Sequence, residues 1–120
     1  MNWSFETDRP IYLQLKEQLL LMIVSGKYPV GAKLPAVRDL AAEASVNPNT
    51  LQKALSELER DGLVYTQRTS GRFVTEDEKM ITQAKTDLAF EQIEMFLKKM
   101  AGIGYSREET LSLIEKKVKE

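Results

Sequence analysis

The chain has 120 residues, a length that is typical of one compact domain or of one small domain with an attachment. Of these residues 42% are apolar and 29% charged, which are values of a folded chain and not of a disordered one. It contains neither cysteine nor histidine, which excludes disulfides, Cys/His zinc sites and catalysis by Ser-His-Asp or Cys-His groups. The net charge of −1 and the isoelectric point of about 5.6 weigh mildly against nucleic-acid binding, so any contact with DNA has to come from a local basic face.

The first predicted helix begins at Pro10, whose fixed φ and missing N–H suit the first helical position. Gly26 is placed to end this helix in a left-handed cap. Residues 1–9, before the helix, are polar and do not resemble a signal peptide. The apolar residues of the helix recur at helical spacing, namely Ile11, Leu15, Leu19, Met22 and Ile23.

Two further helices follow a loop that ends at Pro35. The first covers roughly residues 36–44, and a tight segment separates it from the second. Asn47 is a good N-cap for the second helix and Pro48 a good first residue, while Gly62 suits its end. The apolar face of the first is formed by Val37, Leu40 and Ala41, and that of the second by Leu51, Ala54, Leu55 and Leu58.

A β-hairpin is predicted next, because the pattern of the sequence changes period. Residues 63–66 and 72–75 are typical of strands, and residues 67–71 are typical of the turn between them. Two short helices joined by a tight turn and followed by a hairpin form a winged helix-turn-helix. The sequence therefore predicts a winged helix-turn-helix DNA-binding domain in residues 1–75.

The helical pattern returns from residue 76, where we place the only domain boundary. It is broken at residues 102–104 and resumes after Ser106 and Glu109, which have the spacing of a capping box. Residues 76–120 are thus expected to form a short two-helix tail. The expected fold class is mainly α with a small β-hairpin. No apolar run is long enough to span a membrane, and a cytoplasmic location is expected.

Candidate DNA contacts gather on the third predicted helix. They are Asn47, Asn49, Thr50, Gln52 and Lys53. Amides can form paired hydrogen bonds with adenine in the major groove, and a helix N-terminus suits a phosphate. Arg38, on the preceding helix, is placed to hold the DNA backbone. Each residue also has a simpler alternative role: Asn47 as an N-cap, Thr50 and Lys53 as solvated surface, and Arg38 in a surface ion pair. DNA binding is favoured because all of these residues gather on one helix-turn-helix unit.

The predicted wing carries two cations, Arg68 and Arg72, on either side of its tip. A cation on a wing can enter the minor groove or contact a phosphate. Gly71 can supply a positive φ at the turn. A solvated hairpin without DNA contacts is the alternative, and it would be preferred if no helix-turn-helix lay beside this hairpin.

The predicted tail has too wide an apolar face for two short helices to cover alone. The residues expected to mediate dimerisation are Leu88, Phe90, Ile93, Phe96, Leu97, Met100, Leu111 and Ile114. We expect a second subunit to bury this apolar face, since two-fold pairing doubles a small DNA-binding site and demands a palindromic operator. Packing of the tail within the same chain is the alternative.

A set of motifs runs in a fixed order through residues 10–75. These include PIYLQ at 10–14, Gly26 and Gly31, LPAVRDLA at 34–41, VNPNTL at 46–51, Ala54-Leu55, Leu58-Glu59, Asp61-Gly62-Leu63 and GRFV at 71–74. As an ordered set, they resemble the GntR family of bacterial transcription regulators. The short two-helix tail is similar to that of the YtrA subfamily, because other branches carry a larger effector or aminotransferase-like domain.

The resemblance implies a homodimer formed largely by the tail and repression at a palindromic operator, often beside transporter genes. The family's DNA contacts correspond to Arg38, Asn47, Asn49, Thr50 and Gln52, and to Gly71 at the wing. Many members have Ser where this chain has Ala36, Arg where it has Pro48, and Gly where it has Thr69. The first difference removes a helix N-cap worth about 1 kcal/mol, the second removes a base or phosphate contact, and the third bears on the wing conformation.

The sequence therefore predicts a regulator that binds double-stranded DNA, with no catalytic residues, no cofactor and no metal site. For a small-molecule effector the sequence leaves two alternatives: a chain this short has no enclosed ligand pocket, or it forms one at the junction of the winged domain and the tail. The alternative is a winged-helix protein–protein interaction module without specific DNA binding, which the low isoelectric point favours. A hydrolase or nuclease is the remote third class.

Overall fold

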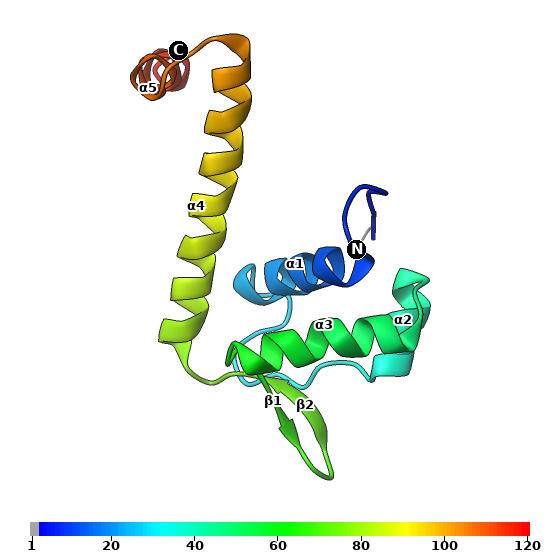
Figure 1. The fold of residues 1–120 in the computed structure, drawn as a ribbon. Coiled ribbons are helices and arrows are strands. Elements are labelled where there is room, and N and C mark those ends of the chain that lie inside the picture. Colours follow the sequence, from blue (N-terminus) through cyan, green and yellow to red (C-terminus); the bar gives the residue numbers. More distant parts are fainter. Residues whose placement is uncertain (1–2) are drawn as a thin grey trace. The chain divides into compact units, whose positions relative to one another are not determined.

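The computed structural model describes residues 3–120, and these residues form five α-helices and one antiparallel β-hairpin (Figure 1). The elements are α1 (Ile11–Val24), α2 (Val37–Ala44), α3 (Pro48–Arg60), β1 (Val64–Gln67), β2 (Gly71–Val74), α4 (Glu78–Ile103) and α5 (Arg107–Val118). The chain divides into two compact units, one ending at Ala84 and the other covering Lys85–Glu120. The predicted class, mainly α with a small hairpin, is confirmed.

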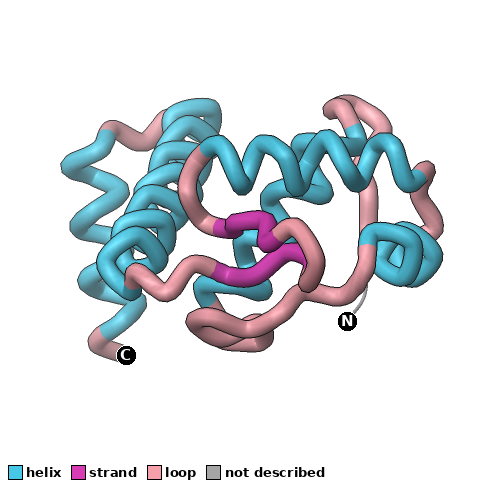
Figure 2. The backbone as a smooth tube through the Cα atoms, turned by 90° about the horizontal axis from the view of Figure 1, so that it is seen from below, coloured by secondary structure: helices cyan, strands magenta, loops and turns pink. Residues whose placement is uncertain are grey.

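The core of the first unit lies between α1, α2 and α3. Every position of the predicted stripe on α3 is buried, and so are Leu40 and Ala41 of α2. From α1, the core receives Leu15, Leu19 and Ile23. Figure 2 shows the hairpin beside α3, to which β1 is joined by a short loop. The predicted positions of the three apolar faces are buried with two exceptions: Ile11, the first residue of α1, is 37% exposed, and Val37 is half-buried.

The helix ends mostly follow the predicted caps. Gly26 and Gly62 adopt positive φ angles of 86° and 83° after α1 and α3. Asn47 caps α3 and Pro48 is its first residue, as predicted. Pro10 is the N-cap of α1 and not its first helical residue, because its ψ of 137° is extended.

The turn between α2 and α3 contains a strained residue that the sequence did not reveal. Ser45 has a φ of 57° and a ψ of 46°, the left-handed conformation. Among the described residues it is the only one other than glycine with a positive φ. Its N–H bonds the Ala42 carbonyl, and the Val46 N–H bonds the Ala41 carbonyl, so the turn satisfies the end of α2.

The hairpin is displaced by one residue at each strand from its predicted position. Val64 pairs with Val74 and Gln67 pairs with Gly71, so only residues 68–70 turn. Residues 32–34 run along the other edge of β2: the Leu34 N–H bonds the Arg72 carbonyl at 2.9 Å, and the Val74 N–H bonds the Ala32 carbonyl at 2.9 Å. The loop before α2 therefore protects the open edge of the wing.

A buried amide holds the polar segment before α1 in place. The Gln14 Oε1 accepts the Glu6 N–H at 2.6 Å, and its Nε2 donates to the carbonyls of Glu6 and Arg9 at 2.9 and 2.8 Å. Gln14 is 2% exposed, and these bonds satisfy a polar group that would otherwise be costly to bury.

The second unit has almost no core of its own. Within Lys85–Glu120, Thr110 is the one buried residue. A break in the helix was predicted at residues 102–104, but α4 continues through Gly102 and ends at Ile103. Gly104 then has a positive φ of 109°. The predicted capping box is confirmed: Ser106 and Glu109 bond each other's backbone N–H, and this lowers the pKa of Glu109. None of the helices in residues 3–120 is both long and apolar enough to cross a membrane.

Replacing Ser45 by Gly is expected to raise the free energy of unfolding by up to about 1 kcal/mol, because glycine adopts the left-handed conformation without the Cβ clash. The matched Ser56→Gly, at an exposed position inside α3, should lower it by about 0.5 kcal/mol. Urea unfolding at one protein concentration measures both. Equal destabilisation by the two substitutions would contradict the strain assigned to Ser45.

Candidate nucleic-acid interface

The buried stripe of α3 decides which side chains of this helix face solvent. Leu51, Ala54, Leu55 and Leu58 are at most 1% exposed, so the helix cannot rotate without uncovering them. The residues left on the outside are polar, namely Asn49, Gln52, Lys53 and Ser56. Thr50 is half-buried at the edge of this face. The structure thus brings the predicted helix residues together on one exposed surface.

The first turn of α3 is organised by Asn47. Its Oδ1 accepts the Asn49 N–H at 2.8 Å, so the oxygen of this amide serves the helix and its NH₂ group remains exposed. Arg38 is exposed on α2, the helix before the turn. A helix N-terminus with exposed amides has donors that phosphate and base edges accept, and the exposed Arg38 guanidinium is a further donor.

Two cationic contacts tie α3 to α1. The Lys53 ammonium lies 3.8 Å from the centre of the Tyr12 ring, a cation–π contact. The Lys16 ammonium lies 2.9 Å from a carboxylate oxygen of Asp61 and 3.6 Å from one of Glu57. Lys53 was predicted to contact phosphate, with a solvated surface position as the alternative. Its contact with Tyr12 places it at the junction of the two helices, which the spacing on α3 alone could not reveal.

The wing is joined to α3 through Glu59, a motif residue to which the sequence assigned no role. A Glu59 carboxylate oxygen accepts the Thr66 hydroxyl at 2.7 Å and lies 3.4 Å from Arg72 Nε. Arg72 Nη1 then donates to the Gln52 Oε1 at 3.2 Å. Arg72 is therefore turned back onto α3, whereas Arg68 is exposed in the turn of the hairpin.

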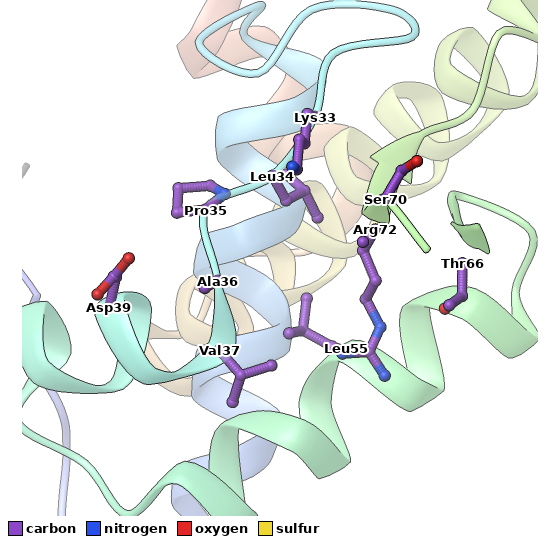
Figure 3. A pocket seen from close by; sticks show the side chains of 11 residues that line it. Lys33, Leu34, Pro35, Ala36, Val37, Asp39, Leu55, Thr66, Ser70 and Arg72 are labelled. Atoms are coloured by element: carbon purple, nitrogen blue, oxygen red, sulfur yellow. The ribbon is translucent and has the colours of Figure 1, made fainter. Parts of the chain in front are cut away.

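A groove of about 730 Å³ lies between the start of α2, α3 and the hairpin (Figure 3). Figure 3 shows the Arg72 side chain extending from β2 toward α3, with Lys33 on the loop before α2. The predicted positive φ of Gly71 is observed at 109°, and a Cβ there would lie 3.3 Å from Lys33 Cε. Lys33 is thus a further exposed cation at the wing, which the sequence motifs did not indicate.

Residues 11–74 match a known family of proteins. The model of "Bacterial regulatory proteins, gntR family" matches residues 11–74. The HTH-type transcriptional regulator YhcF of Bacillus subtilis is 39% identical over 115 residues, which are 96% of this chain and 95% of YhcF. The HTH-type transcriptional repressor YtrA of Bacillus subtilis is 37% identical over 92 residues, 76% of this chain and 71% of YtrA.

Solved structures agree with this similarity. A GntR family transcriptional regulator from Listeria monocytogenes superposes with a TM-score of 0.83 at 38% identity, covering 93% of this chain and 98% of that one. The DNA-binding domain of AraR, solved in complex with the operator ORX1, superposes with a TM-score of 0.55 at 31% identity, over 62% of this chain and 90% of that one.

Replacing Asn47 by Ala is expected to lower the free energy of unfolding by about 1 kcal/mol, because the Asn49 N–H loses its acceptor. Thermal or urea unfolding gives the value. Asn49→Ala is the matched control, since the Asn49 side chain is exposed and makes no capping bond in the described structure. A larger loss for Asn49→Ala than for Asn47→Ala would contradict the role of Asn47 as the cap.

Proposed function

Because the chain belongs to the gntR family of bacterial regulatory proteins, and within it is YtrA-like, we propose that it represses transcription by binding a palindromic operator as a homodimer. The resemblance noted from the sequence is confirmed, as is the winged helix-turn-helix fold. The chain is a DNA-binding regulator of transcription. Repression, the two-fold operator and the dimer are the parts of the proposal that experiments have to test.

The observation that carries the proposal is the polar outer face of α3. In a helix-turn-helix, the second helix enters the major groove and its N-terminal residues contact base edges. We assign base contacts to Asn49, Thr50 and Gln52, and backbone contacts to Arg38 and Lys33. Asn47 adds its exposed NH₂ to these donors, and Lys53 adds positive charge beside them.

Gly71 and Arg68 belong to the wing, which would contact the flanking backbone or the minor groove. That AraR has been solved with an operator on a similar domain supports this assignment.

The proposal of a dimer is supported by the apolar surface of the second unit. Phe90 is 63% exposed and Ile93 is 50% exposed. Phe96 and Met100 of α4 line an open apolar groove of about 380 Å³ with Leu113, Ile114 and Val118 of α5. An exposed apolar surface of this kind on a small unit without a core of its own marks an interaction site. A second copy would bury it symmetrically and would place two α3 helices on one DNA duplex.

A role in catalysis has little support in the chain. The similar proteins are regulators of transcription. Within residues 3–120, Asp and Glu side chains form no cluster that could hold a metal ion. The remaining rival is a winged helix that binds a protein partner, and salt dependence separates this rival from a DNA-binding regulator. A small-molecule effector stays a prediction.

Selection of bound sequences from a random duplex pool, followed by titration at two salt concentrations, tests the proposed function. We expect a two-fold symmetric site to be enriched. Its affinity should fall by roughly 0.9 log units per log unit of salt for each phosphate neutralised. Weak binding without enrichment, and a shallow salt dependence, would favour a protein partner instead.

Replacing Ile93 by Glu is expected to give a monomer that binds the selected site at least tenfold more weakly, because a charge cannot be buried in an apolar interface without a partner. Sedimentation equilibrium measures the mass of the wild-type and variant chains. Lys98→Ala, at another exposed position of α4, is the matched control and should remain a dimer. A dimer that survives Ile93→Glu would contradict the proposed interface.

A further inference from the structure

Four side chains form a continuous hydrogen-bonded chain from the wing to the exposed face of α3. Thr66 and Arg72, on β1 and β2, both contact a Glu59 carboxylate oxygen, at 2.7 and 3.4 Å. Arg72 then contacts Gln52, at 3.2 Å. Thr66 and Arg72 are directly paired across the hairpin, so both strands hold the same carboxylate. The chain of bonds therefore ends on Gln52, one of the residues assigned to base contacts under the proposed function.

The chemistry of arginine fixes how the amide of Gln52 must point. A guanidinium has donors only, so the atom of Gln52 that faces Arg72 must be the carbonyl oxygen. The amide NH₂ is then directed to the other side of the planar group. Within the described residues it donates to no protein atom, so both of its donors are left for a ligand.

The Arg72 side chain lies against α3 and does not extend freely into solvent. Its side chain is 17% exposed, and Nε and Nη1 are both engaged with α3. An exposed cation such as Arg68 has no comparable constraint. Such a surface ion pair adds little stability, but it reduces the rotamers open to Gln52 before DNA arrives.

We propose that Arg72, held by Glu59, is a positioning residue that turns Gln52 into a hydrogen-bond donor toward DNA and so sets which base Gln52 selects. This inference rests on the proposed function. In the major groove, guanine presents two adjacent acceptors, O6 and N7, to which an amide NH₂ can donate. A paired contact with adenine needs both parts of the amide: the NH₂ donates to N7, and the oxygen accepts the N6 amino group. With its oxygen turned to Arg72, Gln52 favours guanine over adenine.

The test compares binding of the full chain to the selected site and to single-base variants of it. In Arg72→Ala, Gln52 is free to turn, and the preference for guanine over adenine at one position in each half-site should fall by about fivefold or more, the lower range of a paired base contact. Gln52→Ala should lose the preference at the same position. Adding Arg72→Ala to Gln52→Ala should then change the preference no further.

Two additional variants keep the result interpretable. Glu59→Gln removes the charge that holds Arg72 and should weaken the same preference, which covers the case in which Arg72→Ala disturbs the wing. Arg60→Ala removes an exposed cation from the end of α3, outside the residues assigned to DNA, and should leave the preference unchanged. Thermal unfolding of each variant reports whether the fold is retained.

The outcomes separate the inference from the proposed function. Uniformly weaker binding in Arg72→Ala, with the base preference retained and the salt slope reduced by about 1, would identify a direct phosphate contact and overturn the positioning role. A preference for adenine at the Gln52 position in the wild-type chain would also overturn it. A wild-type chain without any sequence preference would overturn the proposed function itself.

Discussion

The burial of one stripe of α3 against α1 is the constraint on which the DNA-binding surface depends. Four apolar side chains of α3 are removed from water along 8 residues of helix, and together they fix its rotation about its own axis. The polar face is therefore determined by the core on the other side of the helix. The contacts of Lys16 with Asp61 and of Lys53 with Tyr12 reinforce the same orientation at the helix surface.

The wing takes its place from the same helix. Gly62 turns the chain directly from α3 into β1, and the loop at residues 32–34 bonds the other side of the hairpin. Glu59, near the end of α3, contacts both strands. Helix and wing thus form one pre-organised surface, which reduces the ordering that binding would otherwise require.

Features that depend on a few neighbouring residues could be predicted from the sequence. The cap formed by Asn47 and Pro48, the left-handed Gly62 and the capping box at Ser106 all belong to this group. The strained Ser45 could not be predicted, because serine gives no local signal for a left-handed turn. The roles of Glu59 and Tyr12 could not be predicted either, since their partners lie on other elements, 7 to 41 residues away along the chain.

Affinity cleavage tests most directly the claim that the outer face of α3 enters the DNA groove. Because the chain has no cysteine, a single Ser56→Cys can carry an iron chelate that cuts nearby DNA. Cleavage is expected in two symmetric clusters on the selected site, centred about one helical turn, or a whole number of turns, apart. The same chelate on Ser25→Cys, at the end of α1, serves as the control. Binding without cleavage from position 56, or with stronger cleavage from position 25, would contradict the account.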